Sequence, residues 1–291
     1  MPTASVNNAE TAARAKAAAF TLIELLVVMV VVVFLISTLL PSLARSTVNS
    51  RSYQCLNNHR RLTAAWRMYA DENRDATVFA ADDGSSTGNP LNQYAWASGN
   101  IDFSPGNRNN WDINADITKR PLWPFSGGDA SIYRCPSDES YVVINGTARL
   151  RVRSMSMNIY LGGYVGTDGG WPQLTPYQIF LKTTDINPVG PANAFVFIDP
   201  RVEMGGWANF ATDMTGYGGN PATYELWDLP GLLHDNACGF SFGDGHAELH
   251  RWQDPRTTPT IVQSTPIPIS PIASPRNGDI AWLQNHATRP K

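Results

Sequence analysis

Residues 20–40, FTLIELLVVMVVVVFLISTLL, are almost wholly apolar and carry one charged side chain, that of Glu24. At a rise of about 1.5 Å per residue, a helix of this length spans roughly 31 Å, the thickness of the hydrocarbon core of a bilayer. A carboxylate in hydrocarbon costs about 2.5–3.5 kcal/mol on insertion scales. The stretch therefore predicts a transmembrane helix in which Glu24 needs a compensating positive charge.

Small residues stand before this apolar run, since Ala17, Ala18 and Ala19 directly precede Phe20. A cut between Ala19 and Phe20 would free an α-amino group whose unperturbed pKa is about 8, so it would be largely cationic at neutral pH. That amine would lie one helical turn from the Glu24 carboxylate. In an assembly of parallel helices, the amine of one chain would pair with Glu24 of the next and set their stagger.

The segment AFTLIELLVV followed by Pro41 resembles the N-terminus of type IV pilins and type II secretion pseudopilins. The resemblance implies that a prepilin peptidase cuts between Ala19 and Phe20 and methylates the new amine. Phe20, Glu24 and Pro41 are then the assembly residues of a helical filament. An inner-membrane platform and a cytoplasmic ATPase system would drive that assembly. The chain departs from the family at Ala19, where glycine is usual.

Arg14 and Lys16 flank the apolar run, and positively charged flanks stay in the cytoplasm. We therefore expect a single-pass protein of the bacterial inner membrane with a cytoplasmic N-terminus. After assembly it would form a periplasmic or cell-surface filament. A plain membrane tether for a soluble domain and a signal peptide cut after Ala44 remain alternatives. A buried core helix is disfavoured because the run is apolar on every side.

Composition excludes some functions. Only 16% of the 291 residues are charged and the net charge is −3, which argues against a nucleic-acid partner. No G-x-S-x-G, P-loop or paired-carboxylate pattern is present, so we expect no enzyme. The three cysteines, Cys55, Cys135 and Cys238, form no C-x-x-C pair and allow at most one intramolecular disulfide.

The remaining pattern predicts an α+β protein in which a long helix over 21–73, bent at Pro41, packs on an antiparallel sheet with large loop insertions. Its stripe of Cys55, His59, Leu62 and Trp66 should face the core. The predicted domains are a cleaved cytoplasmic leader (1–19), a transmembrane or filament-core helix (20–40), an amphipathic helix (41–73), a β-rich extracytoplasmic body (74–252) and a Pro-rich arm with a short helix (253–291).

Strand signals recur through the body. The expected elements are strands at 131–138 (SIYRCPSD), 141–144, 150–160 and 194–198 (AFVFI), a hairpin over 237–252, and a helix over 279–284. Asp244-Gly245 marks the hairpin turn, because glycine accepts a positive φ. The loops contain Trp96, Trp111 and Trp123. These side chains would either anchor the loops to the body or form a sugar-binding face.

His234, nine further residues and Asp244-Gly245 resemble the H-x9-D-G signature of a large group of pilin-like proteins. Supporting matches are QCLNN (54–58), CPSD (135–138), SMSMN (154–158) and DIAWLQ (279–284). The resemblance implies a pseudopilin-like subunit without known catalytic activity, and it implies a disulfide between Cys55 and Cys135. Asp199-Pro200 departs from the Asp-Glu of many relatives.

We expect His234, Asp244 and Gly245 to fix the hairpin rather than to bind a cofactor. A Ca²⁺ site built from Asp235 and Asp244 is the alternative, since hard cations prefer carboxylate oxygens. The predicted function is thus a pilin-like structural subunit. A membrane-tethered enzyme and a glycan-binding surface protein are the rivals.

Overall fold

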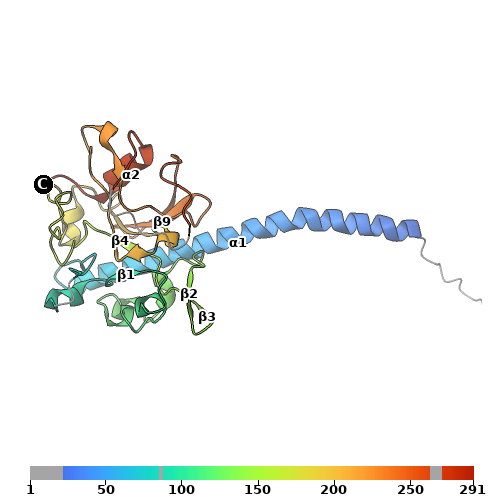
Figure 1. Ribbon diagram of the computed structural model, residues 1–291, viewed down its shortest axis with the longest axis horizontal. Coiled ribbons are helices and arrows are strands. Elements are labelled where there is room, and N and C mark those ends of the chain that lie inside the picture. Colours follow the sequence, from blue (N-terminus) through green and yellow to red (C-terminus); the bar gives the residue numbers. More distant parts are fainter. Residues whose placement is uncertain (1–21, 85–87, 263–270) are drawn as a thin grey trace, which may run out of the picture. The chain divides into compact units, whose positions relative to one another are not determined.

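The computed structural model describes residues 22–84, 88–262 and 271–291, and within these the side chains of 38–49 stay undescribed. The chain divides into two units, Met1–Thr47 and Val48–Lys291. Helix α1 (Leu22–Glu72) runs through the division and is continuous at Pro41, and α2 (Gly278–Ala287) belongs to the second unit (Figure 1). The expected leader, with Ala19 and Phe20, lies outside the described residues.

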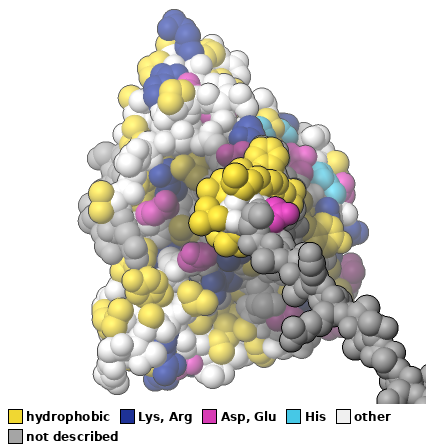
Figure 2. Space-filling model, turned by 90° about the vertical axis from the view of Figure 1, so that its right-hand side faces the viewer, with side chains coloured by type: hydrophobic (Ala, Val, Ile, Leu, Met, Phe, Trp, Pro, Cys, Tyr) yellow, Lys and Arg dark blue, Asp and Glu magenta, His cyan; other side chains and the backbone are white. Residues whose placement is uncertain are grey.

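The first part of α1 carries apolar side chains that are exposed on every side. Their exposed fractions run from 42% at Val32 to 80% at Leu22. Figure 2 shows hydrophobic side chains gathered around this part of the helix. Within the described residues, no helix is both long and apolar enough to cross a membrane. This finding contradicts the expected transmembrane helix over 20–40 and the expected inner-membrane localisation.

The main sheet has the strand order β10-β9-β5-β4-β7. Its strands are β10 (Ala247–Arg251), β9 (Ala237–Phe242), β5 (Phe195–Ile198), β4 (Ser156–Asn158) and β7 (Asn209–Phe210). The β4–β7 pair is parallel and the other three pairs are antiparallel. A parallel pair needs a long crossover, which the fifty residues between these two strands supply.

Three two-stranded sheets and short 3₁₀ helices surround the main sheet in the described part of the chain. The small sheets pair β1 (Asn100–Ile101) with β6 (Gly206–Trp207), β2 (Tyr141–Ile144) with β3 (Thr147–Leu150), and β8 (Glu225–Leu226) with β11 (Ile272–Ala273). The 3₁₀ helices are Pro90–Tyr94, Arg108–Asn110, Ile117–Lys119, Pro124–Ser126, Ala130–Tyr133, Thr183–Ile186, Val202–Met204 and Pro221–Thr223.

The described residues thus form a mixed α/β structure with several sheets, and the expected pilin-like α+β fold is wrong. Two physical reasons account for the difference. Frequent glycine, proline and asparagine turns keep most strands to two to four residues, so the chain divides among small sheets. The long crossover allows a parallel pair where only antiparallel pairs were expected.

Within the second unit, α1 packs along β9, and residues at every fourth position of the helix contact the strand or its flanking residues. The Nε2 of His59 approaches the Asp199 carboxylate beside Gly239, and the Thr63 hydroxyl donates to the Ser241 hydroxyl at 2.7 Å. The Arg67 guanidinium then donates to the Asp244 carbonyl oxygen at 2.6 Å. Steps of four along a helix and of two along a strand keep side chains on one face, so the contacts repeat.

The core lies between α1, the main sheet and the loops that cover it. The predicted stripe on α1 is confirmed, because Cys55, His59, Leu62 and Trp66 are fully buried. Helix α2 begins after Asn277, whose side chain accepts the Asp279 N–H at 2.9 Å. The strand expected at 131–138 is wrong, since Ala130–Tyr133 is a 3₁₀ helix begun by the side chain of Asp129.

Candidate functional site

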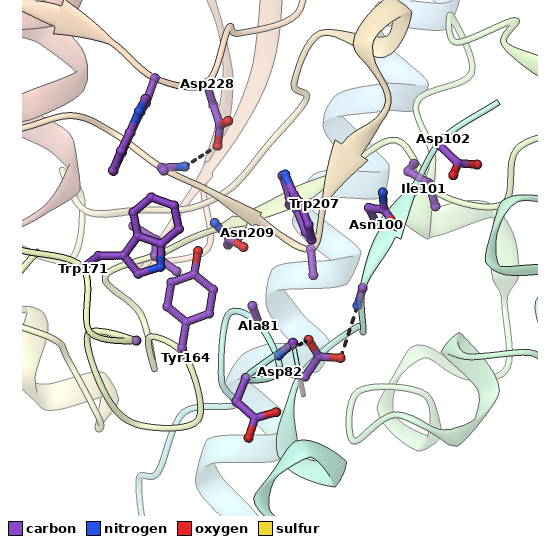
Figure 3. A pocket seen from close by; sticks show the side chains of 18 of the residues that line it. Ala81, Asp82, Asn100, Ile101, Asp102, Tyr164, Trp171, Trp207, Asn209 and Asp228 are labelled. Carbon is purple, nitrogen blue, oxygen red and sulfur yellow. Dashed lines mark hydrogen bonds between the residues drawn. The ribbon is translucent and has the colours of Figure 1, made fainter. Parts of the chain in front are cut away.

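A cavity of about 820 Å³ opens in the second unit and is lined by segments far apart in the sequence. It lies among the loop after residue 80, strand β1, the loop at 164–174, and the chain around β6, β7 and β8. Figure 3 shows aromatic and polar side chains from these segments arranged around the same space. A concave site with apolar walls and a few polar groups is typical of a small-ligand pocket.

Five aromatic rings line this cavity, those of Phe103, Tyr164, Trp171, Trp207 and Trp227. Trp171 stacks on Tyr164 with ring centroids 6.4 Å apart, and its edge meets Trp227 at 4.9 Å. Trp171 and Trp207 remain 42% and 47% exposed, which is unusual for such large apolar side chains. The rings of Trp171 and Trp207 therefore leave apolar surface open to a ligand.

The polar side chains that line the cavity include those of Asp82, Asn209 and Asp228. Asp82 accepts backbone N–H groups from Gly84 and Gly99, and Asp228 accepts the N–H of Ala211 at 2.6 Å (Figure 3). Burial raises the pKa of Asp228 to about 6, although the Ala211 hydrogen bond acts in the opposite direction. The cavity thus combines ring faces with hydrogen-bond acceptors.

A second site is fully buried and joins four segments. We call it the Cys–Asp–His cluster, and its members are Cys55, Cys135, Asp199 and His234. Cys55 comes from α1, Cys135 follows the 3₁₀ helix at 130–133, Asp199 follows β5 and His234 precedes β9. One donor atom from each residue lies within 4.8 Å of all the others, and no second such group occurs among the described residues.

Specific contacts order this cluster. The Cys55 thiol donates to Oδ2 of Asp199 at 3.1 Å, and Cys135 Sγ lies 3.2 Å from Nε2 of His234. The Ser52 hydroxyl contacts the other ring nitrogen of His234, Nδ1, at 3.0 Å. A Cβ at residue 239 would come within 2.6 Å of His59 Nε2, so only glycine fits beside the cluster.

The environment shifts the pKa of each member of the cluster. Burial, the hydrogen bond to Cys135 and the charge of Asp199 raise the pKa of Cys55 well above its usual value. Burial alone would raise the pKa of Cys135 too, but its hydrogen bonds with Cys55 and His234 outweigh burial and lower the pKa to about 7. For Asp199, burial is outweighed by the charge of His59 and its hydrogen bond, and the pKa falls. Burial would lower the pKa of His234, but its contact with Cys135 raises it.

The structure separates the two parts of the His234…Asp244-Gly245 signature. His234 joins the cluster before β9, whereas Asp244 and Gly245 form the turn after β9. Asp244 accepts the backbone N–H of His246 at 3.0 Å, and Gly245 has a φ of +96°. Asp235 pairs with Arg251 at 2.8 Å. The calcium site of Asp235 and Asp244 stays a prediction.

Cys55 and Cys135 are brought together, as the resemblance implied, but the structure has both as free thiols rather than as a disulfide. Ala19 and Phe20 fall outside the described residues, as does the side chain of Pro41, so the processing site and the role of Pro41 stay predictions. Glu24 is exposed near the start of α1.

Sequence reasoning missed Asp199 and His59 as site residues, and it missed all three tryptophans of the cavity. His59 was assigned to packing because its spacing matched the helical stripe. Of the tryptophans that the sequence singled out, Trp96 is fully buried as an anchor, and neither Trp111 nor Trp123 lines the cavity. An acid at the end of a buried strand, as at Asp199, is the signal in the sequence that points to the cluster.

Comparisons of this chain with protein-family models, with curated proteins and with solved structures found no match in any of the three.

Proposed function

We propose that this chain is a structural subunit of a filament, assembled through the first half of α1. The observation that carries the proposal is the all-round exposure of apolar side chains over residues 22–36. Apolar surface of this extent marks a site of association. Because the side chains cover every side of the helix, one chain would contact several neighbours at once, as a helical array requires. The likeness of 19–28 to pilins and pseudopilins supports the same proposal.

The energetics favour such an assembly. Fully burying a valine, leucine or isoleucine side chain contributes about 1.5–3 kcal/mol. About five of the exposed side chains would thus contribute roughly 7–15 kcal/mol, similar to the association cost of about 4–15 kcal/mol. Residues 22–36 hold more than twice that number of large apolar side chains. Covering only part of the surface therefore suffices for stable packing.

Glu24 gives the packing its register. An assembly that covers its apolar neighbours would take this carboxylate out of water, and an uncompensated buried charge is strongly unfavourable. In the proposed filament a prepilin-type peptidase frees the amine of Phe20, and this amine pairs with Glu24 of the adjoining subunit. The pair specifies the stagger, because only one axial offset brings the two charges together.

Replacing Glu24 with alanine should abolish filaments while leaving expression intact. The change leaves the neighbour's amine buried and unpaired, which costs about 3–5 kcal/mol per contact and lowers assembly by more than a hundredfold. Electron microscopy and sedimentation of particles from producing cells measure this. Glu72→Ala is the matched control, since Glu72 is an exposed acid at the other end of α1 and should assemble as the unaltered chain does.

Normal filaments from Glu24→Ala would contradict the charge pair. Mass spectrometry of the native chain tests the rest of the proposal. A polypeptide that begins with methylated Phe20 is expected, and one that retains Met1 or begins after Ala44 would overturn the processing step.

A second function has its own observation, and we also propose that the 820 Å³ cavity binds a carbohydrate. Sugars present apolar C–H faces and hydroxyl rims. The exposed rings of Trp171 and Trp207 suit such faces, and the acceptors Asp82, Asn209 and Asp228 suit the hydroxyls. A filament subunit with this property would present a binding site on its folded body.

Trp171→Ala should weaken glycan binding by about thirtyfold, because truncating a central aromatic anchor costs roughly 2 kcal/mol. A glycan array identifies the best oligosaccharide, and calorimetric titration of that oligosaccharide measures the change. Trp111→Ala is the control, since Trp111 does not line the cavity and should leave the affinity unchanged. An array without any bound glycan, or equal affinities for the two variants, would remove this function.

A further inference from the structure

We propose that the Cys–Asp–His cluster binds one zinc ion, which ties α1 to the body of the second unit. The proposal goes beyond filament assembly and does not depend on it. It also differs from the calcium alternative, because it uses sulfur and imidazole ligands in the core rather than carboxylates near the surface.

The donor set suits zinc. Two thiolates, one imidazole nitrogen and one carboxylate oxygen are ligands that Zn²⁺ takes in four-coordinate structural sites. Bonds of about 2.0–2.3 Å in a tetrahedron place the ligand atoms roughly 3.3–3.8 Å apart. The cluster holds its four donor atoms within 4.8 Å of one another, with contacts of 3.1 Å and 3.2 Å already present. Small shifts of these four side chains would therefore complete a tetrahedral coordination of the ion.

The groups around the cluster are placed as the supports of a metal site usually are. The Ser52 hydroxyl contacts Nδ1 of His234, which leaves Nε2 beside Cys135 as the ligand atom. A histidine that binds metal through one nitrogen commonly gives the proton of the other to such a partner. His59 Nε2 and the N–H of Gly239 both contact Oδ2 of Asp199, at 3.2 Å and 3.3 Å.

An unpartnered atom provides a second, independent observation. The side chain of Asp199 is 0% exposed, and its Oδ1 has no hydrogen-bond partner among the described residues. A buried carboxylate oxygen without a partner costs about 1–3 kcal/mol or more. A bound cation would remove that cost. The orphaned oxygen therefore fits a ligand that the protein chain itself does not supply.

Zinc satisfies the cluster better than a disulfide does. A Cys55–Cys135 disulfide would use both sulfur atoms and leave Asp199 and His234 buried without the thiol contacts they now make. A zinc ion engages all four residues, and its charge offsets the thiolates that form as their protons leave. A second cavity, of about 650 Å³, has Cys135 in its wall and provides access for the ion.

The test uses the full chain, purified without chelator in a mild detergent that covers the apolar side chains of 22–36. Elemental analysis should find one zinc per chain. Cys135→Ser should lose it, whereas Cys238→Ser should keep it, since Cys238 is an equally buried thiol outside the cluster. Ser52→Ala should keep the fold and weaken zinc binding about 10–100-fold. Substitution with Co²⁺ should give thiolate-to-cobalt charge-transfer absorption in the unaltered chain. This absorption should be weakened or lost in Cys135→Ser.

A readout on the unaltered chain covers the case in which Cys135→Ser fails to fold. Removing metal with a chelator should lower the melting temperature, and added Zn²⁺ should restore it. Alkylation in denaturant should count three thiols. A single reactive thiol, meaning a Cys55–Cys135 disulfide, would overturn the proposal. So would zinc retained equally by Cys135→Ser, or a melting temperature indifferent to Zn²⁺ and chelator.

Discussion

Gly162→Ala is expected to destabilise the fold severely. Gly162 has a φ of +77°, and a Cβ there would lie 2.3 Å from the carbonyl oxygen of Val78 and 2.7 Å from Cα of Phe79. The left-handed conformation alone costs an alanine about 1–2 kcal/mol. The overlap is with backbone, which has no alternative rotamer, so the total should exceed about 4 kcal/mol, a large part of the usual 5–15 kcal/mol of stability. Denaturant titration followed by tryptophan fluorescence measures the loss.

Gly146→Ala separates the two causes. Gly146 has nearly the same φ, +78°, in the turn between β2 and β3, but nothing lies within 4 Å of its added Cβ. This variant should fold and lose only about 1–2 kcal/mol of unfolding free energy. Equal losses in the two variants would show that the contact with Val78 carries no cost and that the local packing differs from that described.

The second large effect is expected at Trp96. Its ring is fully buried, and its indole N–H donates to the Ala208 carbonyl oxygen at 2.9 Å. The ring meets Phe197 edge-on at 5.1 Å, and the guanidinium of Arg153 lies 5.3 Å from its centroid. Trp96→Ala removes these contacts and leaves a cavity, which costs about 3–5 kcal/mol. Thermal and denaturant unfolding should both show the loss.

Trp207→Ala provides the comparison for Trp96. Trp207 is 47% exposed at the cavity, and the contacts that Arg153 and Ser156 make are to its backbone carbonyl oxygen, which alanine retains. The cost should stay below about 1 kcal/mol, as for most surface substitutions. A loss at Trp207 as large as that at Trp96 would contradict the assignment of Trp96 as the anchor of the core.

Local chemistry allowed several elements to be predicted from the sequence. The AFVFI segment became the buried strand β5, because a short run of aromatic and β-branched residues bounded by Asp-Pro has few other uses. Asp244-Gly245 placed the turn of the β9–β10 hairpin, and the helix expected over 279–284 lies within α2.

Other features depend on tertiary context and were missed or wrong. The parallel pairing of β4 with β7 joins segments fifty residues apart, and no local signal records which strand becomes a neighbour. A strand was expected to begin at residue 131, but the Asp129 side chain caps a 3₁₀ helix over Ala130–Tyr133. The transmembrane assignment relied on the length of an apolar run, and no helix among the described residues is both long and apolar enough to cross a membrane.

The cluster could be predicted only in part. Cys55, Cys135 and His234 stood out as residue types, and resemblance even paired the cysteines. The sequence did not show that these residues meet, because the four members of the cluster come from four segments far apart in the chain. The cavity was hidden for a similar reason, since Tyr164, Trp171, Trp207 and Trp227 meet only when three loops close around the sheet.

The register between α1 and β9 limits how this chain can evolve. His234, before the strand, contacts Ser52, and Asp244, after the strand, contacts Arg67. Both ends of the stretch that contains β9 are therefore held against α1. Deleting or inserting one residue between His234 and Asp244 would turn the side chains of β9 to the opposite face and break one of these two contacts. The identity of the residues between His234 and Asp244 can therefore change more readily than their number.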